Sequence, residues 1–174
     1  EQELGAVSYV YENGRIVSYS ETVQSPMGGT FDVESVITYN AEGQVESVET
    51  AAYESETNYV YNAEGLLSEK VTAYVYGEEV SYDSKEVYTY ENGKLVKLEY
   101  MYYDWESEEG EWYVVEEYAY TYDANGNCTK ESFTMGEDSW SETVNYYDSQ
   151  NRLIKAVTRD ETRESTREYT YNEQ

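Results

Sequence analysis

The sequence predicts an all-β fold, an antiparallel meander of about 13 to 14 strands in repeated β-hairpins that form a strongly curved sheet or a barrel-like structure. Three observations favour this fold. A Tyr-x-Tyr pattern followed by turn residues recurs along the chain. The 174 residues include 23 tyrosines, and Tyr and Val are residues that favour strands. No stretch carries the hydrophobic period of a helix.

The repeated unit is a strand that ends in an aromatic pair, a short turn, and a return strand that begins with an aliphatic residue. Seven segments carry it, at residues 9–16, 37–45, 59–67, 88–95, 120–128, 145–153 and 169–172. The intervals between the turn glycines vary, so we expect the units to be alike at this turn and different at their far ends.

The turn residues explain the reversals. Residues 13–14 and 92–93 are Asn-Gly pairs, which favour a two-residue type I′ turn because both residues tolerate a positive φ. In three longer turns we expect a glycine in the left-handed position of a bulge, namely Gly43, Gly65 and Gly126. Asn151 occupies that position in the sixth copy, and Asn tolerates it next best.

Both turn lengths place the second tyrosine opposite the first aliphatic residue of the return strand. The predicted pairs are Tyr11 with Ile16, Tyr39 with Val45, Tyr61 with Leu67, Tyr90 with Leu95, Tyr122 with Cys128, and Tyr147 with Leu153. An aromatic–aliphatic cross-strand pair contributes roughly 0.2–1 kcal/mol. We expect the tyrosine ring to cover its neighbours while its hydroxyl stays in water.

Between these motifs the chain is long enough for a return strand and a second turn. The far-end turns are predicted at residues 26–29, 52–55, 76–79, 107–110, 135–138 and 160–163. No linker interrupts the pattern, so residues 1–174 are predicted to be a single tyrosine-rich hairpin-repeat domain.

Charge and composition exclude several classes of function. The formal net charge is −26, which excludes a nucleic-acid binder because phosphate contacts need Lys and Arg. No apolar run approaches the roughly 20 residues of a membrane-spanning helix, so the protein is predicted not to span a membrane. Cys128 is the only cysteine and cannot form an intrachain disulfide. Because the chain begins at Glu1, we expect that an export signal preceded it.

The motif at residues 120–127, Tyr-Thr-Tyr-Asp-Ala-Asn-Gly-Asn, resembles the YD repeat of Rhs-type and teneurin proteins. The other copies resemble it with Glu or Asn in place of the Asp. The chain is also similar to small, exported, tyrosine-rich repeat proteins of Gram-negative gut anaerobes, some of them described as porin-like in fold. The resemblance implies an exported protein, which is periplasmic, outer-membrane-anchored or secreted, and it implies no catalytic residues.

Catalytic chemistry finds little support. The chain has no histidine, which removes the usual near-neutral base. Cys128 occupies an aliphatic position of the repeat, so we interpret it as a small buried hydrophobe. A carboxylate-based glycosidase is a distant alternative. Close carboxyl pairs are inevitable among 37 acidic residues, so their proximity alone does not indicate a glycosidase. We therefore predict a non-catalytic structural or interaction module with no cofactor and no catalytic residue.

The principal candidate site is an aromatic hairpin around residues 102–113. Its candidate ligand-binding residues are Tyr102, Tyr103, Trp105, Trp112 and Tyr113, with Trp140 after the next far-end turn. Exposed rings there would offer a stacking platform for carbohydrate or for a peptide or protein at the cell surface. The alternative is an aromatic cluster that only stabilises the longest hairpin.

Two further interpretations stay open. Acidic residues crowd the same loop as potential calcium ligands, namely Asp104, Glu106, Glu108, Glu109 and Glu111, although a solvated loop explains them equally. The last motif, at residues 169–172, lacks a return strand. It leaves either an open edge for strand addition or a strand that closes the sheet.

Overall fold

The computed structural model describes residues 6–25, 28–107, 110–136 and 139–172. The chain forms two compact units, Glu1–Ser84 and Lys85–Gln174, and each is described by itself below. The single domain expected from the repeat pattern stays a prediction.

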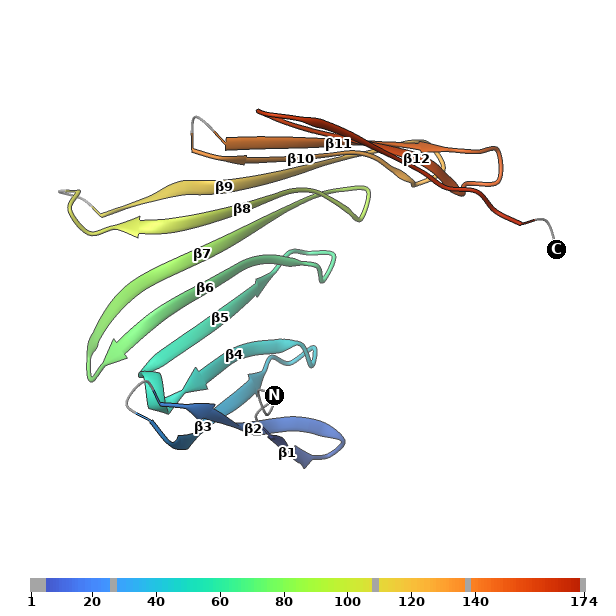
Figure 1. The fold of residues 1–174 in the computed structure, drawn as a ribbon. Coiled ribbons are helices and arrows are strands. Elements are labelled where there is room, and N and C mark those ends of the chain that lie inside the picture. Colours follow the sequence, from blue (N-terminus) through green and yellow to red (C-terminus); the bar gives the residue numbers. More distant parts are fainter. Residues whose placement is uncertain (1–5, 26–27, 108–109, 137–138, 173–174) are drawn as a thin grey trace. The chain divides into compact units, whose positions relative to one another are not determined.

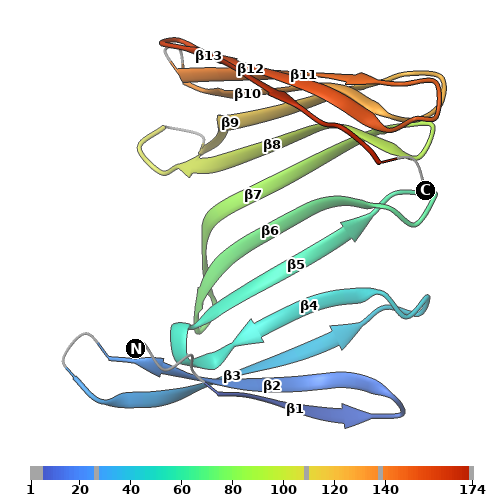
Figure 2. The ribbon, with the colours of Figure 1, turned by 45° about the vertical axis from the view of Figure 1, so that its right-hand side comes forward.

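The first unit contains consecutive antiparallel strands (Figure 1). They are β1 (Val7–Glu12), β2 (Arg15–Gln24), β3 (Thr30–Tyr39), β4 (Val45–Thr50), β5 (Ser55–Tyr61) and β6 (Leu67–Tyr76). A 3-10 turn, η1 (Ala51–Tyr53), joins β4 to β5 and is visible in Figure 2. Strand β7 (Glu79–Glu91) begins in this unit and ends in the second.

The second unit continues the same pattern. Its further strands are β8 (Lys94–Asp104), β9 (Glu111–Tyr122), β10 (Cys128–Met135), β11 (Ser139–Tyr147), β12 (Leu153–Asp160) and β13 (Glu164–Glu168). The 13 described strands follow one another in sheet order from β1 to β13, which confirms the predicted meander. Because β1 and β13 lie at opposite ends of this order, the described strands do not close into the barrel-like alternative.

The turns form as their residues dictate. Asn13 and Gly14 have φ values of 50° and 79°, as the two-residue turn requires. Gly43 has a φ of 82° and Asn151 a φ of 60°, so Asn takes the left-handed position where the repeat lacks glycine. The registers confirm five of the expected aromatic–aliphatic pairs, those of Tyr11, Tyr39, Tyr61, Tyr122 and Tyr147.

The far-end turns agree with the sequence wherever the structure describes them. Reversals occur at residues 51–54, at 77–78 and at 160–163. Glu54 adopts a φ of 48° at the first of these, directly after η1. The other three expected turns include residues 26–27, 108–109 and 137–138, which lie outside the described residues.

Few side chains are fully buried. Among the described residues the buried hydrophobic ones are Val33, Ala73 and Val157, and Ser35 is the buried polar one. Cys128 is half-buried, so the expected buried hydrophobe is only partly shielded from water. Most strand residues are intermediate in exposure, because their neighbours lie beside them in the sheet and not above them. Burial is therefore shared among many cross-strand contacts.

Tyrosine hydroxyls join successive hairpins, which corrects the expectation that they stay in water. Each bond runs from the second tyrosine of a motif to the carbonyl of the first aliphatic-position residue in the preceding return strand. These bonds are Tyr39 to Ile16 at 2.6 Å, Tyr61 to Val45 at 2.9 Å, Tyr122 to Leu95 at 2.9 Å, Tyr147 to Cys128 at 2.9 Å and Tyr171 to Leu153 at 2.8 Å. We call this contact the tyrosine latch. In these five places it couples a hairpin to its neighbour, as in other repeat folds.

A second contact accompanies the latch. The residue directly before the accepting aliphatic residue places its cationic group over the latching ring. Arg15 lies over Tyr39 with 5.3 Å from Cζ to the ring centroid, and Lys94 lies over Tyr122 with 5.1 Å from Nζ to the centroid. Arg152 lies over Tyr171 at 4.8 Å. Such cation–π contacts add to the coupling between hairpins.

Candidate functional site

The aromatic hairpin is formed by β8 and β9. Their register pairs Tyr102 with Tyr113 and Tyr103 with Trp112. Paired residues share a face of the sheet and successive residues alternate, so these two pairs lie on opposite faces. The prediction from the sequence placed the five rings of residues 102–113 on one platform, whereas the strand register divides them between two surfaces.

On one face, three rings form a continuous cluster. The centroid of Tyr103 lies 4.5 Å from that of Trp105 and 5.2 Å from that of Trp112, and both pairs are edge-to-face. Trp105 is 55% exposed even though it contacts Tyr103. We call Tyr103, Trp105 and Trp112 the indole cluster. Edge-to-face contacts hold the rings in place and leave the Trp105 ring accessible to a ligand.

Backbone geometry holds the indole cluster at the end of its hairpin. Gly110 has a φ of 64°, and a Cβ added there would lie 2.1 Å from the Tyr103 hydroxyl oxygen. Glycine is therefore required both for its conformation and for the close approach of the ring. The carboxylate of Asp104 accepts a hydrogen bond of 2.8 Å from the Glu106 backbone N–H.

The electrostatic surroundings of the cluster are mixed. The ammonium group of Lys85, on β7, lies 5.8 Å from the Trp112 ring centroid. Acidic residues Asp104, Glu106 and Glu111 flank the rings along the chain. Of the predicted calcium ligands, Glu108 and Glu109 lie outside the described residues. The part of the chain that the structure describes contains no group of three or more acidic or cysteine side chains arranged to hold a metal ion.

The opposite face carries a different aromatic group. Tyr118 packs against Tyr100 with centroids 5.8 Å apart and against Phe133 with centroids 4.9 Å apart. Burial raises the pKa of the Tyr118 hydroxyl, and the carboxylate of Glu116, which accepts a hydrogen bond of 3.2 Å from it, raises the pKa further. This group is more shielded than Tyr102 and Tyr113, which are 49% and 52% exposed. The shielded group serves packing more than recognition.

Trp140 stands apart from the indole cluster. It lies on β11 opposite Thr134 of β10, and it is 43% exposed. Its backbone N–H donates to the Glu161 carboxylate at 3.1 Å. The register places Trp140 on the same face as Trp112 but two strands further along the sheet. The prediction that Trp140 is exposed is therefore confirmed, but Trp140 does not contact the indole cluster with which it was grouped.

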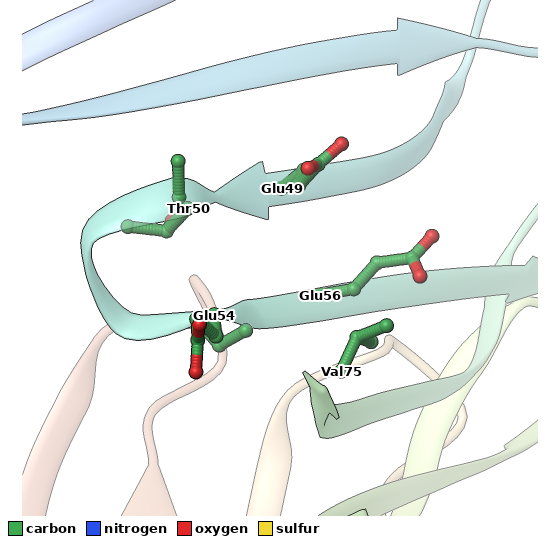
Figure 3. A pocket seen from close by; sticks show the side chains of 7 residues that line it. Glu49, Thr50, Glu54, Glu56 and Val75 are labelled. Carbon is green, nitrogen blue, oxygen red and sulfur yellow. The ribbon is translucent and has the colours of Figure 1, made fainter. Parts of the chain in front are cut away.

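A cavity of about 340 Å³ lies at another far-end turn, the one between β4 and β5. It is lined by Glu49, Thr50, Ala51, Glu54, Ser55, Glu56 and Val75. In Figure 3 the side chains of Glu49 and Glu56 extend from the two strands, while that of Glu54 lies at the turn. Glu49 and Glu56 are cross-strand partners, which places two like charges side by side.

The cavity lacks the features of a sugar-processing site. None of its lining residues is aromatic, so a sugar ring would find no stacking surface there. The glutamates also come from adjacent strand positions and one turn, and not from opposite walls of a cleft. The sequence did not single out this cavity, because nothing in the spacing of Glu49, Glu54 and Glu56 marks a chemical site.

The fold and the aromatic surface define an all-β protein of hairpin repeats. No protein-family model matches the chain, and no curated protein matches it. Among solved structures, the TcdB2-TccC3-TEV crystal structure is similar, with a TM-score of 0.61 at 14% identity. That match covers 93% of this chain but 10% of the other, so this chain spans about a tenth of the similar structure's length.

Two weaker similarities are to DUF3836 family proteins. The one from Parabacteroides distasonis has a TM-score of 0.31 and 15% identity, over 60% of this chain and 89% of the other. The one from Bacteroides vulgatus has a TM-score of 0.28 and 16% identity, over 65% of this chain and 92% of the other. Of these matches, the one with the TM-score of 0.61 establishes a likeness of fold. No helix in the described part of the chain is long and apolar enough to cross a membrane.

Proposed function

We propose that this chain is a non-catalytic, exported interaction module. The observation that carries the proposal is the excess of exposed over buried aromatic and aliphatic side chains. The described residues bury three hydrophobic side chains, whereas many large ones are exposed, among them Tyr11, Trp105, Tyr113 and Trp140. Exposed apolar surface of this kind commonly marks a binding site. The export half of the proposal rests on the resemblance to exported tyrosine-rich repeat proteins.

The indole cluster is the part of this surface best suited to a ligand. Its three rings are held edge to face on one side of the sheet, and Trp105 remains accessible. An aromatic ring presented in this way stacks on the apolar face of a sugar ring. Glu106, which follows Trp105 in the chain and is exposed, offers a carboxylate acceptor for sugar hydroxyls. We therefore propose a neutral carbohydrate as the ligand class, with a hydrophobic peptide as the competing one.

The glycosidase alternative draws on the cavity lined by Glu49, Glu54 and Glu56. A glycosidase needs two carboxyl groups on either side of the scissile bond. Here two of the three carboxylates belong to directly paired residues of neighbouring strands. The aromatic cluster and the carboxylates also lie in different units of the chain. Binding is therefore the function that the site favours over hydrolysis.

A glycan array followed by calorimetry tests the proposal. Trp105→Ala is expected to weaken binding of any positive glycan about tenfold or more, because a stacking ring is typical of a binding hot spot. Trp140→Ala is the matched control, since that ring is also exposed and lies on the same face without contacting the cluster. Its affinity should stay unchanged.

Tyr102→Ala provides a second control, because this ring belongs to the opposite face of the same hairpin. Equal losses in Trp105→Ala and Tyr102→Ala would indicate that the hairpin was merely distorted. The absence of binding to every glycan, together with binding to hydrophobic peptides, would replace carbohydrate with the competing ligand class.

A further inference from the structure

The first strand of the sheet exposes the donating half of the contact that joins the hairpins elsewhere. Elsewhere in the sheet, each latching tyrosine lies beside the return strand of the preceding hairpin. The described bonds start from Tyr39, Tyr61, Tyr122, Tyr147 and Tyr171. In each case the acceptor is a backbone carbonyl. The latch therefore depends on where the accepting strand lies and tolerates different side chains at the accepting residue.

Tyr11 holds the equivalent position in β1, because it pairs with Ile16 as Tyr39 pairs with Val45. It is 62% exposed, whereas Tyr39, Tyr61, Tyr122 and Tyr147 are half-buried. No hydrogen bond joins the Tyr11 hydroxyl to another described residue. All six residues of β1 are exposed, and β1 stands at one end of the strand order.

We propose that the outer edge of β1 binds a β-strand of a partner chain that carries the same type of return strand. The incoming strand would run antiparallel to β1 and begin with a basic residue followed by an aliphatic one. Its aliphatic residue would supply the carbonyl that accepts from Tyr11. Its basic residue would lie over the Tyr11 ring, as Arg15 lies over Tyr39. This site is independent of the carbohydrate site proposed above.

Continuity with the existing interface identifies this partner. A strand edge offers unpaired backbone groups to any extended peptide, so the edge alone would not select one. The latch and the cation–π contact add two selective features, and both recur in the second unit at Tyr122, with Leu95 as acceptor and Lys94 over the ring. The net charge of −26 further favours a basic strand over an acidic one.

A labelled peptide copying residues 93–100 provides the test, because it contains the Lys94-Leu95 pair in its native order. Fluorescence anisotropy measures its binding to the whole chain. Tyr11→Phe is expected to weaken binding by about two- to tenfold, as the loss of one hydrogen bond predicts. Tyr9→Phe is the matched control, since Tyr9 lies on the same strand and the latch does not require its hydroxyl. It should leave the affinity unchanged.

A photo-crosslinking group on the same peptide locates the site. Crosslinks on β1 support the proposal, and crosslinks confined to β13, the other end of the strand order, overturn it. The same peptide with N-methyl groups on alternate backbone amides should not bind, because strand addition needs those donors. Equal binding of both peptides, no binding of either, or a homodimer through β1 that excludes the peptide would each overturn the proposal.

Discussion

Each hairpin has a turn end, which carries the Asn-Gly or longer glycine turn of the repeated motif, and a far end. The turn ends repeat one set of contacts, whereas the three far-end turns that the structure fully describes each use a different one. Four turn-end loops begin with an Asn or Asp whose side-chain oxygen accepts the backbone N–H four residues later. The accepting residues are Asn40, Asn62, Asp123 and Asp148, at 2.8–3.0 Å. The far ends use η1 with Glu54, a glycine turn at Gly77, and a turn capped by Asp160.

This difference follows from what each end contacts. The turn ends contact one another through the tyrosine latch and through residues that directly follow some of the turn glycines. Gln44, for example, donates from its side chain to the carbonyl of Gly65 at 2.8 Å. A change at one turn end therefore affects two hairpins, and the same residues are needed in each copy. The three far-end turns that the structure fully describes show no such repeated contact, so their lengths and residues vary.

The largest expected effect concerns the glycine of a long turn. A Cβ at Gly43 would lie 2.3 Å from Arg15 Nη2, whereas a Cβ at Gly14 would meet nothing within 4 Å. Both positions are left-handed, which costs roughly 1–2 kcal/mol for alanine. Gly43→Ala should lose a further ~0.5–1 kcal/mol, because Arg15 must leave the Tyr39 ring.

Chemical denaturation of Gly43→Ala and Gly14→Ala measures this difference. Repeating both substitutions in an Arg15→Ala background isolates the coupling between hairpins, and the extra loss at Gly43 should then vanish. If Gly14→Ala destabilises the protein as much as Gly43→Ala does, the turn glycines serve only their own hairpins.

An intermediate effect is expected from removing one latch. Tyr122→Phe deletes the hydrogen bond to the Leu95 carbonyl and should reduce the free energy of unfolding by roughly 0.5–1.5 kcal/mol. Tyr11→Phe, at the equivalent position without a latch, should change it by less than about 0.5 kcal/mol. Urea unfolding followed by tyrosine fluorescence compares the two. A loss at Tyr11 that matches the loss at Tyr122 would argue against the latch as a source of stability.

The smallest effect tests what the two ends share, which is a carboxylate that accepts backbone hydrogen bonds. Hydrogen bonds from the backbone N–H of Thr162, from its hydroxyl and from Arg163 together lower the pKa of Asp160 to about 2. The side chain of Asn127 and the backbone of Arg152 likewise lower the pKa values of Asp123 and Asp148.

A carboxyl whose folded-state pKa is depressed contributes stability above its unfolded pKa of roughly 3.9 and loses it as the pH falls through the folded value. The Tm difference between the native chain and Asp160→Asn should therefore be constant above about pH 5 and shrink between about pH 4 and about pH 2. NMR titration of the Asp160 carboxyl locates the midpoint directly. A midpoint near the ordinary value would refute the role of Thr162.

The sequence was sufficient to predict the local structure. Asn-Gly at residues 13–14, glycines such as Gly43 and the Tyr-x-Tyr alternation determine reversals and register, because these depend on φ preferences and on a two-residue period. The confirmed pairs of Tyr61 with Leu67 and of Tyr122 with Cys128 follow from those local rules. The identity of the exposed aromatic residues was also predictable, since Trp105 and Trp140 lie beside far-end turns.

Only the tertiary structure decided what the side chains do once the strands pair. The latch from Tyr39 to Ile16 spans 23 residues, and no local pattern specifies where a hydroxyl will point at that distance. The division of the aromatic hairpin between two faces arose from strand register, which places Tyr102 opposite Tyr113 and Tyr103 opposite Trp112. Backbone preferences act within a few residues, whereas these contacts depend on how neighbouring hairpins align, and that alignment is a property of the assembled sheet.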